Sequence, residues 1–305
     1  MTVRVSWRGL TIGAALAFAL AGPAKADGLV QFDKLLKPMV PPGALTYKSA
    51  SALGDNGFVL EGVTVTDTSD GGDKKQPIAI KKITVEEFDF PGFEKDHAPN
   101  FVKTRIEGIA IGGQPADGVD LKELVGVDHL TADFQLDLRL EPDKKVLTVK
   151  TLALDLNGLG HIEVSLILDG VEGDPAQRDK DMDNAELRTA SLTFEDRSML
   201  GKLVPAVAKM QGSDAAATVA MAKMMLEGAR AGQGQATQAA FDALASFLDD
   251  YKKPKGPLTV TLKPDGKLSG ASLKNAGGPD DVIKALGLAV SYAGTVPHPS
   301  APLKQ

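Results

Sequence analysis

Residues 130–140 alternate strictly between apolar and polar side chains, and this pattern constrains the fold more than any other stretch of the chain. Every even position from Leu130 to Leu140 is apolar, whereas the odd positions are Thr131, Asp133, Gln135, Asp137 and Arg139. Successive side chains of a β-strand point to opposite faces of a sheet. The pattern therefore predicts a strand whose even-numbered side chains line the main core or a cavity. The same prediction extends over residues 130–168, where the even-numbered row from Ile162 to Leu168 repeats the pattern.

Two more strands are predicted to follow it as an antiparallel meander. The predicted order is a turn at 141–145, a strand at 146–156, a turn at 158–160 and a strand at 162–168. In the middle strand, Leu147 and Val149 have the opposite parity to Leu152, Leu154 and Leu156. This strand is therefore predicted to carry a bulge or to be covered on both sides. Such a meander leaves one face open to water or to a ligand.

Period-two patterns also predict strands within residues 44–112 and at 185–194. Breaks in parity near Gly62 and Gly108 predict bulges, and hence a curved sheet. Residues 28–38 have the spacing of a short amphipathic helix that ends at Pro38, and 69–76 resemble a hairpin loop.

A helical block is predicted at 196–253. Its first helix contains Pro205, Ser213 is expected to cap the second, and the third has an apolar face made of Phe241, Leu244, Leu248 and Tyr251. A hairpin at 258–273 and a short helix at 280–288 close the domain.

The predicted fold class is thus α+β, a curved antiparallel sheet with a C-terminal helical block packed on one face. We expect a single domain at 27–296, with 27–195 mainly β, 196–253 helical and 254–296 a closing hairpin and helix, followed by a flexible tail at 297–305.

The first 26 residues have the order of a cleavable export signal. Arg4 and Arg8 precede an apolar run, and Ala24-Lys25-Ala26 offers small residues at the positions that a signal peptidase reads. Cleavage is expected before Asp27, which predicts a periplasmic protein without a stable transmembrane anchor. The chain contains no cysteine, so it has neither disulfides nor a lipid-modified cysteine.

Composition argues against nucleic-acid binding. The net charge is −6, and removal of residues 1–26, which contain three basic and no acidic side chains, makes it −9. Such a chain repels phosphate backbones. No catalytic or cofactor motif is present, and no cofactor is expected.

Two clusters resemble metal sites only in part. Asp179, Asp181 and Asp183 alternate like the start of a calcium loop, but Asn184 and Ala190 stand where that loop needs Gly and Glu. His129, His161 and Asp128 could approach one another and hold zinc. The preferred interpretation is a solvated loop and surface histidines, and thus no metal.

A deformable apolar surface is the most suggestive feature. Methionine side chains adapt to varied ligands or partners, although they also fill ordinary cores. The candidate surface for an apolar ligand combines helical methionines with the predicted apolar row: Met221, Met224, Met225, Phe134, Leu136 and Leu138.

Four stretches resemble an uncharacterised family of proteobacterial periplasmic proteins, a domain of unknown function. They are PPGALTYKSASALGDNGFVLEGVTV, LALDLNGLGHIEVSLILDGV, LTFEDRSMLGKLV and KGPLTVTLKP followed by IKALGLAVSY. The resemblance implies the location and the fold but transfers no active site. Within the third stretch, Asp196 or Ser198 is placed to cap the next helix.

Three functions remain open. The first is a non-enzymatic periplasmic protein that binds an apolar or lipid ligand between sheet and helices. The second is a structural subunit of an envelope complex, with an envelope protein as its partner. The third is an enzyme whose site is assembled from residues distant in sequence.

Overall fold

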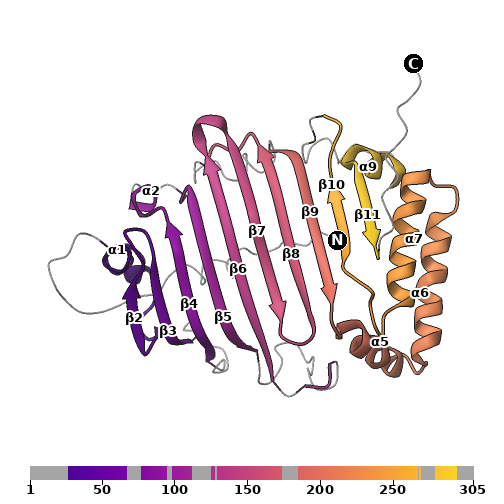
Figure 1. Ribbon diagram of the computed structural model, residues 1–305, viewed down its shortest axis with the longest axis horizontal. Helices are drawn as coiled ribbons and strands as arrows, with labels where there is room; N and C mark the ends of the chain where they lie inside the picture. The colour runs from indigo at the N-terminus through magenta and orange to yellow at the C-terminus, as the bar shows by residue number, and fades with distance from the viewer. Residues whose placement is uncertain are drawn as a thin grey trace.

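The computed structural model describes residues 27–66, 77–94, 98–111, 125–127, 129–173, 185–266, 268 and 279–293. In these residues one open antiparallel sheet of eleven strands runs the length of the molecule (Figure 1). From β3 to β11 each strand lies beside its neighbour in sequence, and β1 and β2 both pair with β3. The strands are β1 (Leu45–Thr46), β2 (Ser49–Ala52), β3 (Phe58–Val65), β4 (Ile78–Phe88), β5 (Phe101–Ile111), β6 (Leu130–Glu141), β7 (Val146–Leu156), β8 (Gly160–Asp169), β9 (Glu186–Asp196), β10 (Leu258–Leu262) and β11 (Leu288–Tyr292).

The helices gather at the two ends of this sheet (Figure 1). Near β2 and β3 lie α1 (Gly28–Leu35), the short 3₁₀ helix η3 (Lys37–Met39) and α2 (Phe90–Glu94). Beyond β10 lie α5 (Met199–Met210), α6 (Ala215–Arg230), α7 (Gln235–Asp249) and α9 (Pro279–Leu286), and α7 packs on β11 and β10. The predicted class, α+β with a curved antiparallel sheet and a mainly C-terminal set of helices, is confirmed.

The predicted meander is confirmed as β6, β7 and β8. The 3₁₀ helix η4 (Pro142–Lys144) forms the first turn, and Lys145 follows it in the left-handed conformation. The register between β6 and β7 shifts by one residue between Asp137 and Leu138, because β7 has an extra residue near Lys150. This is the bulge that the change of parity predicts.

A second bulge lies at Gly108. Its φ of +64° is costly for residues with a side chain, and its N–H donates to Asp133 Oδ1 at 2.6 Å. The register between β5 and β6 shifts there, between Ile106 and Ile109. The break in parity near Gly108 thus marks a real bulge.

Three sequence-based expectations are wrong in detail. The cap of α6 is Asp214, which accepts from Ala217 N at 2.8 Å, and not Ser213. The buried side of α7 includes Ala240, Ala243 and Phe247, each one residue before a member of the predicted face, whereas Tyr251 of that face, just after the helix, is buried as expected. The strand that returns beside β10 is β11, and not the second half of a 258–273 hairpin, because β9 and β11 occupy both edges of β10.

The buried core of the described residues is divided among four separate clusters. One lies where α1 packs on β3–β5, and another where α7 packs on β9–β11. Two smaller clusters lie at the ends of the meander strands, around Leu159 and around Leu140. In the middle of the sheet, Phe134 packs against the edge of the cluster near α1, and the other apolar side chains of β6–β9 there belong to none of these clusters.

A candidate apolar ligand surface

One row of side chains shows that both helical ends cover the same face of the sheet. Residues directly opposite each other in an antiparallel pair point to the same face. The paired positions link Leu60 on β3, through every strand between, to Tyr292 on β11. Both ends of the row are buried, Leu60 near α1 and Tyr292 beneath α7. The members between them are Ile83, Ile106, Phe134, Leu154, Ile162, Phe194 and Leu258.

Among the residues that the structure describes, no helix or loop covers the middle of this face. Leu152 on β7 and Leu192 on β9 have 36% and 39% of their surface exposed, and their apolar neighbours are only half-buried. We call this area the apolar floor. It consists of Phe134, Leu136 and Leu138 on β6, Val149, Leu152 and Leu154 on β7, Ile162, Val164 and Leu166 on β8, and Ala190 and Leu192 on β9.

The four buried clusters bound the apolar floor on four sides. The clusters under α1 and α7 flank the floor on its two sides, over the neighbouring strands. The clusters around Leu140 and Leu159 flank it at the two ends of its strands. Four strands about 4.8 Å apart give a floor roughly 15 Å wide. An exposed apolar patch of this size, with a rim of packed structure, is typical of an interaction surface.

The six predicted surface residues fall into two separate groups. Phe134, Leu136 and Leu138 belong to the apolar floor. The three methionines Met221, Met224 and Met225 lie on α6, which packs on α5 and α7, and 60–72% of their surface is exposed. Figure 1 shows α6 beyond β11 at one end of the sheet, whereas β6 lies near the middle, so the structure does not bring the two groups together.

The even-numbered floor residues of β7 and β8 were predicted to share this face, but Val149 on β7 and the two floor residues of β9 were missed. Their alternation is visible in the sequence, but the bulge near Lys150 reverses the parity of β7. Only the register shows that Val149 and Leu152 share a face, since Val149 lies opposite Leu138 and Leu152 opposite Leu136.

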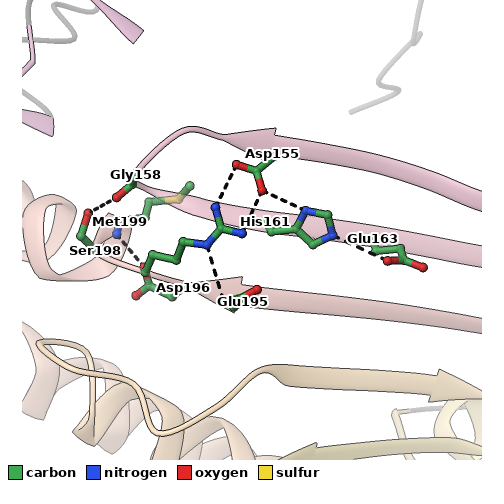
Figure 2. Close-up of polar contacts among 9 residues, drawn as sticks. Asp155, Gly158, His161, Glu163, Glu195, Asp196, Ser198 and Met199 are labelled. Atoms are coloured by element: carbon green, nitrogen blue, oxygen red, sulfur yellow. Dashed lines mark hydrogen bonds and ion pairs between the residues drawn. The ribbon is translucent and has the colours of Figure 1, made fainter. Parts of the chain in front are cut away.

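The opposite face of β7, β8 and β9 has a cluster of charged groups (Figure 2). Arg197 holds Asp155 with two contacts of 2.9 Å, from its two terminal nitrogens to the two carboxylate oxygens. This hydrogen bonding raises the pKa of Arg197 above its ordinary value. His161 lies between two carboxylates, with Nδ1 3.3 Å from Asp155 Oδ2 and Nε2 3.6 Å from Glu163 Oε2.

The start of α5 is fixed beside this cluster. Asp196 accepts from Met199 N at 2.6 Å and from Leu200 N at 3.1 Å, so of the two predicted candidates Asp196 supplies the capping side chain, although Ser198 occupies the N-cap position. Burial raises the pKa of Asp196, whereas these backbone donors lower it. Ser198 Oγ donates to Gly158 O at 2.7 Å. Figure 2 shows that Ser198 points to this turn and away from His161, so the pair does not have the geometry of a nucleophile and its base.

The cluster ties β7, β8 and β9 together on the polar face of the sheet.

In the described part of the chain, no three His, Asp or Glu side chains form a group that could hold a metal ion. His129 is exposed at the start of β6. The calcium-like loop, Asp128, His97, His298, the export segment, the loop at 69–76 and the tail lie outside the described residues.

Comparisons with known proteins extend over part of the chain. A family model described as "Uncharacterized protein" matches residues 153–293, which run from within β7 through the C-terminal helices to β11. No curated protein matches the chain. Residues 153–293 are therefore similar to an uncharacterised family, and this similarity includes the β8 and β9 part of the apolar floor.

Proposed function

We propose that this protein binds acyl chains of a lipid on the apolar floor. The observation that carries the proposal is the exposure of Leu152 and Leu192 in the middle of a face whose two ends are buried. All eleven floor side chains are hydrocarbon, so the floor offers apolar area and no hydrogen-bonding side chain. Covering such area with hydrocarbon gains about 25 cal/mol per Å².

The backbone under the floor favours an acyl chain over a peptide. Peptides that join a sheet do so through free backbone groups at an edge strand. The floor strands β6, β7 and β8 each pair on both sides with neighbouring strands, and β9 pairs with β8 and β10. The floor therefore offers a peptide no backbone partner, whereas an acyl chain needs none.

The proposed location is the periplasm, after export and cleavage before Asp27. Support comes from the order of residues 1–26 and from the resemblance to proteobacterial periplasmic proteins. The Asp27 carboxylate accepts from Val30 N at 2.9 Å and so caps α1, which makes Asp27 a suitable first residue for the folded chain. Among the described helices, none is long and apolar enough to cross a bilayer. N-terminal sequencing of the periplasmic fraction tests this location, and an intact Met1 in the membrane pellet would contradict it.

A fluorescent fatty acid tests lipid binding directly. We expect a saturable increase in fluorescence with the purified protein, and a loss of at least tenfold in affinity in a Leu152→Gln, Leu192→Gln double variant. The matched control is Thr151→Gln with Thr193→Gln, one residue away on the opposite face, which should bind normally. Equal binding by the two double variants would refute the floor as the site. Native mass spectrometry of protein purified from its own envelope would then identify any lipid that is retained.

A second function, contact with an envelope protein, is favoured by the exposed methionines on α6. Met221, Met224 and Met225 are adaptable apolar side chains that contribute little to the fold when exposed. Crosslinking in the envelope from a photoreactive residue at Met224 tests this alternative. Specific capture of one protein there, together with no fatty-acid binding, would favour the structural function over lipid binding.

A further inference from the structure

Asp33 is a buried carboxylate without a hydrogen-bond partner in the described part of the chain. Its side chain is 8% exposed, and both of its carboxylate oxygens are shielded from solvent. The nearest cation, Lys37 Nζ, is 3.9 Å from Oδ1, which is too far for a hydrogen bond. The hydroxyl of nearby Tyr47 is also buried without a partner. Ionising a carboxyl group in such surroundings is costly, which favours its neutral, protonated form.

Asp33 belongs to the helix that covers one end of the apolar face. In α1, Phe32 is fully buried and stacks on Phe58 of β3, with ring centroids 4.1 Å apart. Leu36 is buried beside it, and the start of α1 at Gly28 lies directly against the backbone of Gly57. Asp33 follows Phe32, so a charge on Asp33 acts against the packing of α1 on the sheet.

We propose that Asp33 is a proton-controlled latch, which holds α1 on the sheet when its carboxyl group is protonated and loosens α1 when that group ionises. The bond that changes is the O–H bond of the carboxyl group, and the proton exchanges with solvent. Released α1 lets water reach Asp33 and uncovers Phe58 and Leu60 beneath it.

The surrounding charges set the pH at which the latch acts. Burial raises the pKa of Asp33 to about 7, with Asp27 adding to the rise and Lys37 opposing it. Burial and the charge of Asp33 also raise the pKa of Tyr47.

The acids on elements that pack against α1 have other partners. Glu61 on β3 accepts from Ser49 at 3.2 Å, and Glu94 on α2 pairs with Lys34 at 2.6 Å. Asp33 is therefore the group in α1 whose ionisation changes with pH near neutrality.

The consequence for a ligand rests on the proposed function. Phe58 and Leu60 lie on the same face as the apolar floor, on the far side of β4 and β5. Loosening α1 extends the exposed apolar face toward β3, and acidification closes this end again. The latch itself is independent of any ligand and can be tested in its absence.

Hydrogen exchange measured by mass spectrometry tests the latch. Exchange rates of the α1 amides, corrected for their intrinsic pH dependence, are compared from pH 5 to pH 8 in the purified protein. Because protonation is linked to docking, we expect α1 protection to be about tenfold higher at pH 6 than at pH 8. Peptides from β7 and β8 should keep constant protection and serve as the internal reference.

Two variants complete the test. Asp33→Asn keeps the shape without the charge, so its α1 protection should be independent of pH; Asp143→Asn, at an exposed site in η4, should behave like the wild type. Gly28→Ala gives the signal of undocked α1, since an added Cβ would clash with Gly57. Wild-type α1 protection that does not depend on pH would refute the latch, as would equal losses in α1 and in β7–β8. Neither result would bear on fatty-acid binding.

Discussion

Leu136 on β6 and Leu152 on β7 lie directly opposite each other on the apolar face, yet Leu152 keeps 36% of its surface exposed. In a two-layer domain such a pair is covered by a second layer. The described helices that cover this face lie at the ends of the sheet, over β3 and over β10–β11. Leu136 and Leu152 therefore have the orientation of core residues without the cover of a core.

The first prediction separates orientation from burial. Leu136→Asp places a charge on the apolar floor, where it keeps part of its hydration, so we expect a loss of about 1–2 kcal/mol in unfolding free energy and loss of fatty-acid binding. Gln135→Asp lies on the polar face and should change stability by less than about 0.5 kcal/mol. Urea denaturation and fatty-acid titration of both variants provide the measurements. Equal effects would mean that the two side chains do not face opposite sides.

The second prediction locates the core at the ends of the sheet. Leu60 is completely buried under α1, whereas Leu192 on the apolar floor is 39% exposed. Leu60→Ala should cost about 2–5 kcal/mol, because it leaves a cavity. Leu192→Ala should cost about 1 kcal/mol or less, because water already reaches this side chain. The denaturation midpoints of the two variants provide the measurement. A larger loss of stability for Leu192→Ala than for Leu60→Ala would place the core at the centre of the sheet.

The long strands such as β6 and β8 were predictable because their side chains alternate over many residues. The alternating row from Leu130 to Leu140 can be interpreted only as a strand. The bulge in β7 was visible as a change of parity. The sequence did not show whether the apolar row is covered. Whether a helix covers this row depends on the position of α7, and that position is determined by the contacts of α7 with β10 and β11.

The errors at the helices have the same origin. Ala240, Ala243 and Phe247 form the buried side of α7, although two of them have little hydrophobic surface. Small side chains are selected by the close approach of β11, a long-range contact that helical spacing alone does not contain. Likewise, β11 was missed because it is short and its partner β10 lies 26 or more positions earlier.

The third prediction concerns the start of α5. Asp196 accepts backbone N–H groups of Met199 and Leu200 and is buried. Asp196→Ala removes this cap and should cost about 1–2 kcal/mol. Glu195→Ala, whose exposed carboxylate is 3.5 Å from Arg197 Nε, should cost less than about 0.5 kcal/mol. Thermal unfolding measures both, and equal losses would show that the cap adds nothing beyond the surface ion pair.

The last prediction gives the pH dependence of stability a sign. The pKa of Asp33 is raised from 3.8 to about 7 in the folded protein, mainly by burial. Between these two values the folded state holds a proton that the unfolded state has lost. The contribution of Asp33 to folding is therefore complete below about pH 4, falls as the pH rises toward 7, and is flat above that.

Chemical denaturation at several pH values measures this contribution as a difference between wild type and Asp33→Asn, which cancels the titration of all other groups. The difference should change by up to about 2.5 kcal/mol between pH 5 and pH 8, in favour of the wild type at the lower pH. Lys37→Met removes the charge that lowers the pKa of Asp33, so the decline should extend to higher pH. If the difference were constant with pH, Asp33 would titrate alike in the folded and unfolded chains. Its buried, unpartnered carboxylate would then have to be hydrated, and α1 would not pack on the sheet as described.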